Sequence, residues 1–298
     1  MKFRFYTCDV FTETRFGGNP LAVLPDARGL SDQDMQQIAR EFNYSETTFV
    51  FPPDGPNTRK VRIFTPAQEM PFAGHPNVGT AFVLATLGQV EPGLVSFEEL
   101  AGIVPITIEE KGGRLYCELK APNPLSLGQE VPVNLVADAL SLQAEDIAIS
   151  RHEPLVASVG FPFVFVELKD MTALERPKIN GAGFDSLAAF LGSPFQALVY
   201  IYVRTQDEVD IRARMFAPLS GVPEDPATGS AACAVAGLQA SLESASSGSF
   251  AYRIAQGVEM GRPSLLQTRA EKVDSAVPST WVSGTCVMVS EGFIEVDA

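Results

Sequence analysis

The chain contains the stretch Arg62-Ile63-Phe64-Thr65-Pro66, followed by Pro71 and by His75-Pro76-Asn77-Val78-Gly79-Thr80-Ala81. A later stretch repeats the pattern: Arg214-Met215-Phe216-Ala217-Pro218, then Pro223, then Asp225-Pro226-Ala227-Thr228-Gly229-Ser230-Ala231. The matched residues from the arginine to the isolated proline are 152 positions apart (214 − 62), and those from His75 and Asp225 onward are 150 apart (225 − 75). Both spacings are about half of the 298 residues, so we predict a tandem duplication. Chance similarity between two turns rich in proline and glycine is the alternative.

Each half is predicted to be a set of strands around one very apolar helix. Helices are expected at 32–42 (with Ser31 as N-cap and Asp34 in the first turn), 76–87, 184–191 and 226–242. Strands are expected at 3–11, 47–51, 59–64, 94–97, 103–109, 114–119, 155–168, 197–203, 209–216, 249–254, 264–269 and 284–289. The helices 76–87 and 226–242 are apolar nearly all round, and such helices are buried. The predicted fold class is therefore α+β, with two pseudo-symmetric lobes whose strands wrap a central helix.

The turn-rich, polar segment Ala121-Pro122-Asn123-Pro124 is the expected linker between the lobes. We assign residues 1–122 to an N-terminal lobe and residues 123–284 to a C-terminal lobe. Residues 285–298 have no helix of their own and could return to the N-terminal lobe to complete it.

The composition excludes several classes of partner. With 22 basic and 36 acidic residues the formal net charge is −14, which repels DNA and RNA, and no cluster of Lys and Arg opposes this. A small acidic substrate remains compatible, because a local pocket can be positive on an acidic protein. We expect no membrane partner, because no apolar run approaches the ~20 residues that span a bilayer.

The cysteines and histidines favour neither a disulfide framework nor a metal centre. Cys8, Cys117, Cys233 and Cys286 are scattered, and no CxxC or HExxH motif occurs. Reduced thiols in a cytoplasmic protein are the simplest interpretation, and the first residues lack the apolar region of a signal peptide. A P-loop and a GxSxG motif are also absent from the sequence.

Both apolar helices are predicted to begin with a polar residue before proline, as His75-Pro76 and Asp225-Pro226. The free N–H groups of a first helical turn bind anions. If the halves face each other, both helix starts address one cleft, where backbone N–H groups would hold a substrate carboxylate. Gly74, Gly79 and Gly229 would let the backbone approach that ligand closely.

Four ordered segments then carry a family resemblance. They are Asn43-Tyr44-Ser45-Glu46-Thr47-Thr48-Phe49-Val50, Pro71-Phe72-Ala73-Gly74-His75-Pro76, Glu224-Asp225-Pro226-Ala227-Thr228-Gly229-Ser230-Ala231 and Gln256-Gly257-Val258-Glu259-Met260-Gly261-Arg262-Pro263-Ser264. With the opening Asp9-Val10-Phe11 and Gly17-Gly18-Asn19-Pro20, the chain resembles the PhzF-like family over nearly its whole length. The resemblance implies the diaminopimelate epimerase fold, in which each of two lobes is a strand barrel around a central helix.

The resemblance also implies a function and a set of site residues. It implies a cofactor-independent isomerase, commonly a homodimer, similar to the one that acts on trans-2,3-dihydro-3-hydroxyanthranilate. Glu46 would be the proton shuttle, with Gly74, His75, Asp225, Gly229 and Ser230 around the substrate.

The residues themselves agree with a single shuttle. One carboxylate can remove a proton and return it elsewhere if its pKa lies near the working pH. Glu46 has no carboxylate counterpart at the 150-residue offset, where Gln196 stands. A two-cysteine racemase is disfavoured, because His75 and Asp225 occupy the helix starts and Cys233 is expected to be buried in its helix.

Each nominated residue also has a structural interpretation: a solvated charge for Glu46, an N-cap for Asp225, a hydrogen-bonded core histidine for His75, a helix hydrogen bond for Ser230, and turn glycines for Gly74 and Gly229. Two other functions remain open. One is an epimerase of another amino or imino acid, and the other is a non-catalytic protein that binds a small molecule in the same cleft.

Overall fold

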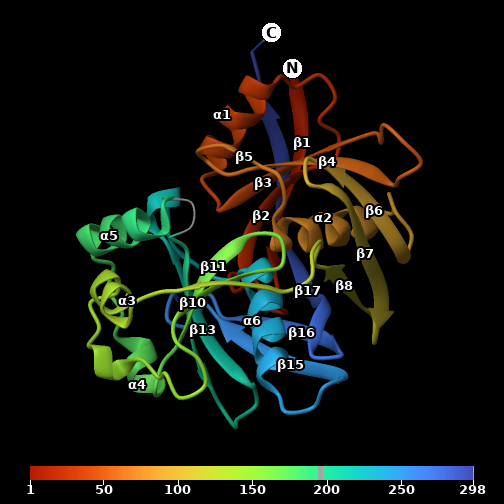
Figure 1. Ribbon diagram of the computed structural model, residues 1–298. Helices are drawn as coiled ribbons and strands as arrows, with labels where there is room; N and C mark the ends of the chain where they lie inside the picture. Colours follow the sequence, from red (N-terminus) through yellow and green to blue (C-terminus); the bar gives the residue numbers. More distant parts are fainter. Residues whose placement is uncertain (194–196, 298) are drawn as a thin grey trace. The chain divides into compact units, whose positions relative to one another are not determined.

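The computed structural model describes residues 1–193 and 197–297 and divides the chain into two compact units. Unit 1 consists of Met1–Lys120 and Ser283–Ala298, and unit 2 consists of Ala121–Val282. The strand β17 (Ala276–Glu295) therefore begins in unit 2 and ends in unit 1. Both units combine strands with a buried helix (Figure 1).

Unit 1 contains a closed barrel. Its strands are β1 (Lys2–Val10), β2 (Asn19–Leu24), β3 (Glu46–Phe51), β4 (Arg59–Phe64), β5 (Glu69–Met70), β6 (Gly93–Glu99), β7 (Gly102–Lys111), β8 (Arg114–Lys120) and the end of β17. Hydrogen-bonded neighbours run β1–β2–β3–β4–β6–β7–β8–β17 and return to β1, so these eight described strands form a ring.

The helix α2 (Gly74–Thr86) is the core of this barrel. It packs against β1, β2, β3, β7 and β8, and every residue from Gly74 to Leu84 is buried. The predicted buried helix is confirmed. A second helix, α1 (Asp32–Phe42), begins as predicted, with Ser31 and Asp34 forming a capping box.

Unit 2 repeats this design with additional helices. Its strands are β9 (Ser126–Glu130), β10 (Leu155–Ser158), β11 (Pro162–Glu167), β12 (Val199–Arg204), β13 (Ile211–Ala217), β14 (Val222–Asp225), β15 (Gly248–Gln256) and β16 (Ser264–Val273). The apolar helix α6 (Gly229–Leu242) packs against β10, β11, β15 and β16 and is buried from Gly229 to Ala240 except at Ser230. The other helices are α3 (Val133–Ala139), α4 (Met171–Glu175), α5 (Gly181–Leu191) and the short turns η1 (Ala144–Asp146) and η3 (Pro218–Ser220).

The two units share one order of strand pairing. In unit 1 the pairs β1–β2, β3–β4, β4–β5 and β6–β7 are antiparallel, and β2–β3 and β4–β6 are parallel. In unit 2 the antiparallel pairs are β10–β11, β12–β13, β13–β14 and β15–β16, and the parallel pairs are β11–β12 and β13–β15. The predicted fold class, α+β with strands wrapped around a central apolar helix in each lobe, is confirmed.

Two matched residues of the repeat, Arg62 and Arg214, have the same structural role. Arg62 donates from Nε and Nη2 to both carboxylate oxygens of Glu69, at 2.6 and 2.7 Å. Arg214 does the same with Glu224, at 2.7 and 2.9 Å. Bidentate pairs of this kind fix geometry. They tie β5 to β4 and β14 to β13, which are the short strands that lead toward α2 and α6.

The start of α2 differs from the prediction. The helix begins at Gly74 with Ala73 as N-cap, so His75 and Pro76 lie inside its first turn. Proline is tolerated there because the first N–H groups of a helix have no partner within the helix.

The start of α6 differs more. Helix α6 begins at Gly229, not at Pro226, and Asp225 is the last residue of β14. The reason is Gln256, whose Nε2 donates to the Asp225 carbonyl at 2.8 Å and whose Oε1 accepts from the Thr228 N–H at 3.2 Å. These bonds hold the backbone extended for the three residues before the helix.

The predicted single strand at 155–168 was also wrong. It is a hairpin of β10 and β11, in which Ser158 pairs with Pro162. Gly160 has φ 145°, a value that favours glycine, and it forms the turn. An apolar run hid this turn from the periodicity of the sequence.

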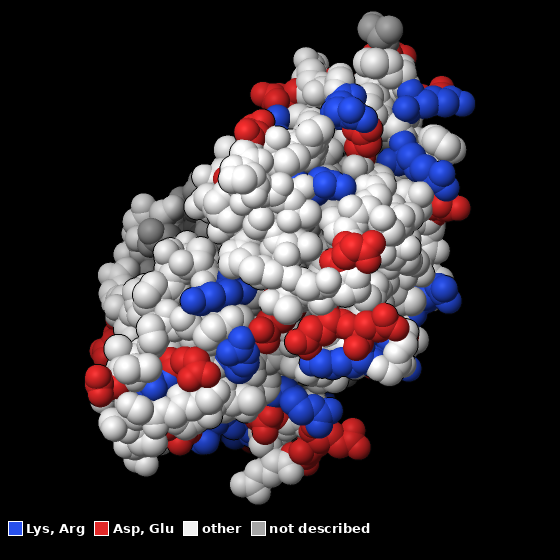
Figure 2. All heavy atoms as spheres, turned by 90° about the vertical axis from the view of Figure 1, so that its right-hand side faces the viewer, with Lys and Arg blue, Asp and Glu red and all other residues white. Residues whose placement is uncertain are grey.

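Charged side chains of both signs are interspersed on the face shown in Figure 2, where Lys and Arg lie singly or beside Asp and Glu. Within residues 1–193 and 197–297, no helix has the length and apolar character needed to cross a membrane.

Candidate active site

The start of α2 brings two predicted site residues together. Glu46 is the first residue of β3, and its Oε2 lies 3.5 Å from Nε2 of His75 in the first turn of α2. The His75 side chain is 4% exposed and that of Glu46 is 16% exposed. Burial lowers the pKa of the His75 imidazole to about 3, so the ring is neutral at neutral pH and the contact is not an ion pair.

Asn19 selects the tautomer of His75. Its Nδ2 lies 3.2 Å from His75 Nδ1, and an amide nitrogen is a donor, so Nδ1 accepts. In a neutral ring the proton then resides on Nε2, the nitrogen that faces Glu46. Asn19 is fully buried at the start of β2, and the tight turn before it requires Gly18, because a Cβ there would lie 2.4 Å from the Val10 carbonyl oxygen.

The same helical turn carries further buried polar groups. Asn77 is fully buried, and its Nδ2 donates to the carbonyl of the N-cap residue Ala73 at 2.9 Å. Glu99, the last residue of β6, has both carboxylate oxygens shielded from solvent, and it is close enough to Asn77 for the amide to stabilise a charge on it. Burial nevertheless raises the pKa of the Glu99 carboxyl to about 8.

In unit 2, Asp225 is held by a chain of hydrogen bonds. The Thr228 hydroxyl donates to Asp225 Oδ2 at 2.6 Å and accepts from Gln256 Nε2 at 3.0 Å. Asp225 is 5% exposed, and Gln256 is fully buried. This arrangement fixes the position of the Asp225 carboxylate and leaves its second oxygen to other contacts.

The segment that follows Gln256 folds against the same turn. The Ser264 hydroxyl donates to the Pro226 carbonyl at 2.9 Å. Gly257 has φ 73°, and a Cβ there would lie 2.6 Å from the same carbonyl oxygen. Only glycine allows this approach, so the segment locks the chain before α6.

The remaining predicted site residues lie at the two helix starts. Gly74 is the buried first residue of α2, Gly229 is the buried first residue of α6, and the half-buried Ser230 follows Gly229. Gly79 does not fit the prediction of a ligand contact, because a Cβ there would lie 2.6 Å from Leu21 Cδ2, a side chain of β2. Its role is the close packing of α2 on the barrel.

The structure therefore groups Glu46, Gly74 and His75 within unit 1, and Asp225, Gly229 and Ser230 within unit 2. The expectation of one shared cleft concerns the relative placement of the units, and it stays a prediction.

Comparisons with known proteins show what the chain is related to. It matches the model of the family described as "Phenazine biosynthesis-like protein" over residues 8–292. The chain belongs to this family.

Relatives of this phenazine biosynthesis-like chain are named as isomerases. An uncharacterized isomerase of Mesorhizobium japonicum is 38% identical over 291 residues, which cover 95% of this chain and 96% of that protein. Trans-2,3-dihydro-3-hydroxyanthranilate isomerase of Pseudomonas aeruginosa is 34% identical over 290 residues, which cover 97% and 98%. The chain is an isomerase of this family, as the sequence predicted.

Solved structures agree on the fold. The PhzF-family protein of Bacillus anthracis superposes with a TM-score of 0.87 at 27% identity, covering 99% of this chain and all of that one. A hydroxyproline epimerase from Agrobacterium vitis has a TM-score of 0.63 at 15% identity, covering 100% and 93%, which is a likeness of fold alone.

In this family member Glu46 has an apolar counterpart. Gln196, the counterpart proposed from the sequence, lies outside the described residues. The strand register gives a different match, because Thr47 pairs with Phe64 in unit 1 and Val199 pairs with Phe216 in unit 2. The residue equivalent to Glu46 is thus Leu198, which is buried. The two units therefore differ in chemistry at this position.

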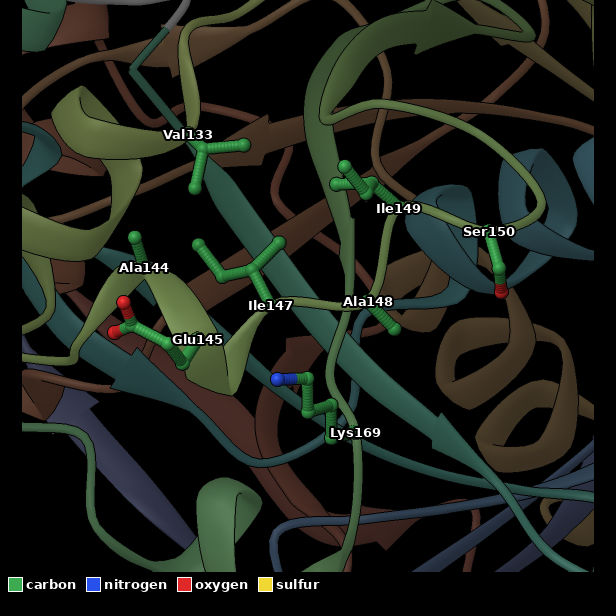
Figure 3. Close-up of a pocket in the computed structure, with 8 residues that line it drawn as sticks. All are labelled: Val133, Ala144, Glu145, Ile147, Ala148, Ile149, Ser150 and Lys169. Carbon is green, nitrogen blue, oxygen red and sulfur yellow. The ribbon is translucent and has the colours of Figure 1, made fainter.

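Other parts of the phenazine biosynthesis-like chain offer no competing centre. Within residues 1–193 and 197–297, no group of three or more His, Cys, Asp or Glu side chains is arranged to hold a metal ion. A pocket of about 600 Å³ in unit 2 is lined mainly by apolar side chains, with Glu145 and Lys169 among them (Figure 3). None of the six predicted site residues lines this pocket.

Sequence reasoning missed the residues that position the site. Asn19 and Gln256 both occur in the segments that carried the family resemblance, and Thr228 lies between two nominated residues. Their presence in those segments was the available signal. Asn77 and Glu99 gave no such signal, because their proximity arises only when β6 packs beside α2.

Proposed function

We propose that this isomerase moves a proton on a small carboxylated substrate without a cofactor, and that Glu46 carries the proton. The observation that supports this most is the Glu46 carboxylate beside the neutral, buried imidazole of His75. A carboxylate is a base strong enough to take an activated C–H proton when it is partly desolvated, and it becomes the acid that returns it.

The proposed reaction has two balanced steps. Glu46 accepts the proton of a C–H bond, and the electron pair of that bond moves into the adjacent conjugated system of the substrate. The Glu46 carboxylic acid then protonates a different carbon, which restores the carboxylate. The His75 Nε2–H beside it is a hydrogen-bond donor and stabilises negative charge on Glu46 or on the substrate.

Substrate binding is proposed for Gly74, His75, Asp225, Gly229 and Ser230. The N–H groups of the first helical turn at Gly74 suit a carboxylate. The substrate class follows from the relatives named trans-2,3-dihydro-3-hydroxyanthranilate isomerase, which are 33–34% identical to this chain. An aminocarboxylate of this kind is the compound that we propose to test.

The test is incubation with trans-2,3-dihydro-3-hydroxyanthranilate in deuterated buffer, followed by NMR. We expect conversion with deuterium at the newly protonated carbon, and a loss of about 10²–10⁴-fold for Glu46→Gln. Glu41→Gln, which changes an exposed carboxylate on α1, is the matched control and should keep full turnover. Full turnover by a folded Glu46→Gln protein would refute the assignment of the shuttle.

An epimerase is the second candidate, because a predicted epimerase of Pseudomonas aeruginosa superposes with a TM-score of 0.81 at 28% identity. Inversion of a stereocentre, with deuterium at that same carbon, would identify it. Label-free binding would instead indicate a non-catalytic protein.

The proposal includes a cytoplasmic homodimer, as the family resemblance implies. The free thiols of Cys8, Cys117 and Cys233, all buried, are compatible with a reducing compartment. Light scattering during gel filtration tests the dimer.

A further inference from the structure

Glu99 lies beside the start of α2 but has no part in the proton transfer proposed above. The turn after β6 is held against the segment that leads into α2, because the Ala101 N–H donates to the Pro71 carbonyl at 3.0 Å. This contact brings Glu99 next to the first turn of the helix. Both Glu99 oxygens are shielded from solvent and lack a hydrogen bond of proper geometry within the described residues.

The start of α2 has the features of a binding site. Its N-cap, Ala73, has no side chain that can accept from the first N–H groups. Two fully or almost fully buried side chains in this turn have a polar atom without a hydrogen bond from the described residues, namely Oδ1 of Asn77 and Nε2 of His75. Polar atoms buried in this way call for a partner.

The charge of Glu99 decides how well this turn accepts an anion. Burial keeps the Glu99 carboxyl protonated at neutral pH, because its pKa is raised to about 8. In that form its O–H is the donor that Asn77 Oδ1 lacks. In the ionised form it would add a negative charge beside Glu46, and a bound substrate carboxylate would be a third negative charge in one desolvated place.

The other charged groups on neighbouring elements have partners of their own. On β4, Lys60 pairs with Asp54 at 2.6 Å, and Arg59 donates to the carbonyls of Thr58 and Gln89. On β6, Glu98 accepts from the N–H groups of Asp54 and Gly55. On α2, His75 is neutral. A change in the charge of Glu99 is therefore not compensated by these groups.

We propose that Glu99 is a protonation-controlled specificity residue: the neutral carboxyl leaves the α2 start open to a substrate carboxylate, and the ionised form excludes it. The inference rests on the proposed function, since it assigns the substrate carboxylate to this helix start. It adds a residue and a pH response that the proton transfer through Glu46 does not require.

The test is the binding of 3-hydroxyanthranilate, a carboxylate with the same ring substituents that has no hydrogen to shift. Calorimetric titrations from pH 6.5 to 9.5 would give its Kd for the whole protein. We expect the Kd of the wild type to rise about tenfold between pH 7 and pH 9, as Glu99 ionises. Glu99→Gln, which stays neutral, should bind with a Kd that changes less than about twofold over this range.

Glu98→Gln is the matched control, because it removes the neighbouring carboxyl that faces the 54–57 loop. It should keep the tenfold rise. A flat profile for the wild type, an unchanged rise in Glu99→Gln, or failure of the wild type to bind the probe at pH 6.5 would each overturn the proposal.

The outcome is distinguishable from failure of the proposed function. Binding of 3-hydroxyanthranilate requires no turnover, so a rise in Kd that depends on Glu99 would stand even if trans-2,3-dihydro-3-hydroxyanthranilate were not converted. Conversion that depends on Glu46, without any pH response from Glu99, would remove this inference alone. Parallel measurements of KM and kcat in the active case should place the effect of Glu99 in KM.

Discussion

Replacing Glu99 by glutamine should stabilise the fold, and the gain should depend on pH. The unfolded carboxyl releases its proton near the ordinary pKa of 4.5, whereas the folded one retains it until about pH 8. Between these values the folded state binds more protons than the unfolded state, so wild-type stability falls as pH rises. The interval of about 3.5 pKa units corresponds to at most about 5 kcal/mol, and the loss is complete above pH 8.

Urea unfolding of both proteins at pH 4.5, 6.5, 8 and 9 measures this difference. The free energy of unfolding of Glu99→Gln minus that of wild type should increase from pH 4.5 to pH 8 and then level off. Subtraction removes the contribution of His75, whose lowered pKa makes stability rise between about pH 3 and 6.5 in both proteins. Glu98→Gln should respond in the opposite sense, because hydrogen bonds from Asn57 and the loop backbone lower the pKa of Glu98. A constant difference across the pH range would refute a buried neutral Glu99.

Three other substitutions test the positioning of the helices. Thr228→Val leaves Asp225 without its hydroxyl donor and should cost about 1–3 kcal/mol in urea unfolding, with Thr228→Ser restoring most of it; equal stability of the two variants would contradict the relay. Gly79→Ala forces a Cβ into barrel side chains and should lower the unfolding free energy by about 1–3 kcal/mol, and an unchanged Tm would show that α2 packs less closely. Arg214→Met isolates the half-buried Glu224 and should cost about 3–5 kcal/mol near neutral pH but much less at pH 3; a loss that is independent of pH would exclude the charge as its cause.

The sequence predicted the elements whose pattern is strong. The all-apolar helices and the alternating strands were found because burial on every side, or on one face, leaves a direct record in residue order. The hairpin at Gly160 was missed because its flanking strands are both apolar, and a continuous apolar run carries no sign of a turn.

The helix starts could be predicted only in part. His75 and Asp225 match in the repeat, yet one lies in a helix and the other ends a strand. The difference comes from Gln256, a side chain about 30 residues downstream of Asp225 whose amide takes backbone hydrogen bonds that a helix would otherwise use. Local sequence contains no information about such a partner.

The candidate site shows the same division. Glu46 and His75 were nominated from motifs, and the structure brings their side chains together. Asn77 and Glu99 were not nominated, because a carboxyl at the end of one strand and an amide in a helix become neighbours only through the packing of the barrel. Their chemistry belongs to the tertiary structure and not to any segment.

The strand β17 has a consequence for how the protein is made. Its last residues pair with β1, so Lys2 lies opposite Glu295, and the barrel of unit 1 cannot close until the ribosome has released that region. All residues of unit 2 are synthesised before Ser283. Unit 2 can therefore fold while the chain is still growing, whereas the strands of unit 1 wait with open edges for most of translation. The first residues to be made are thus among the last to be folded.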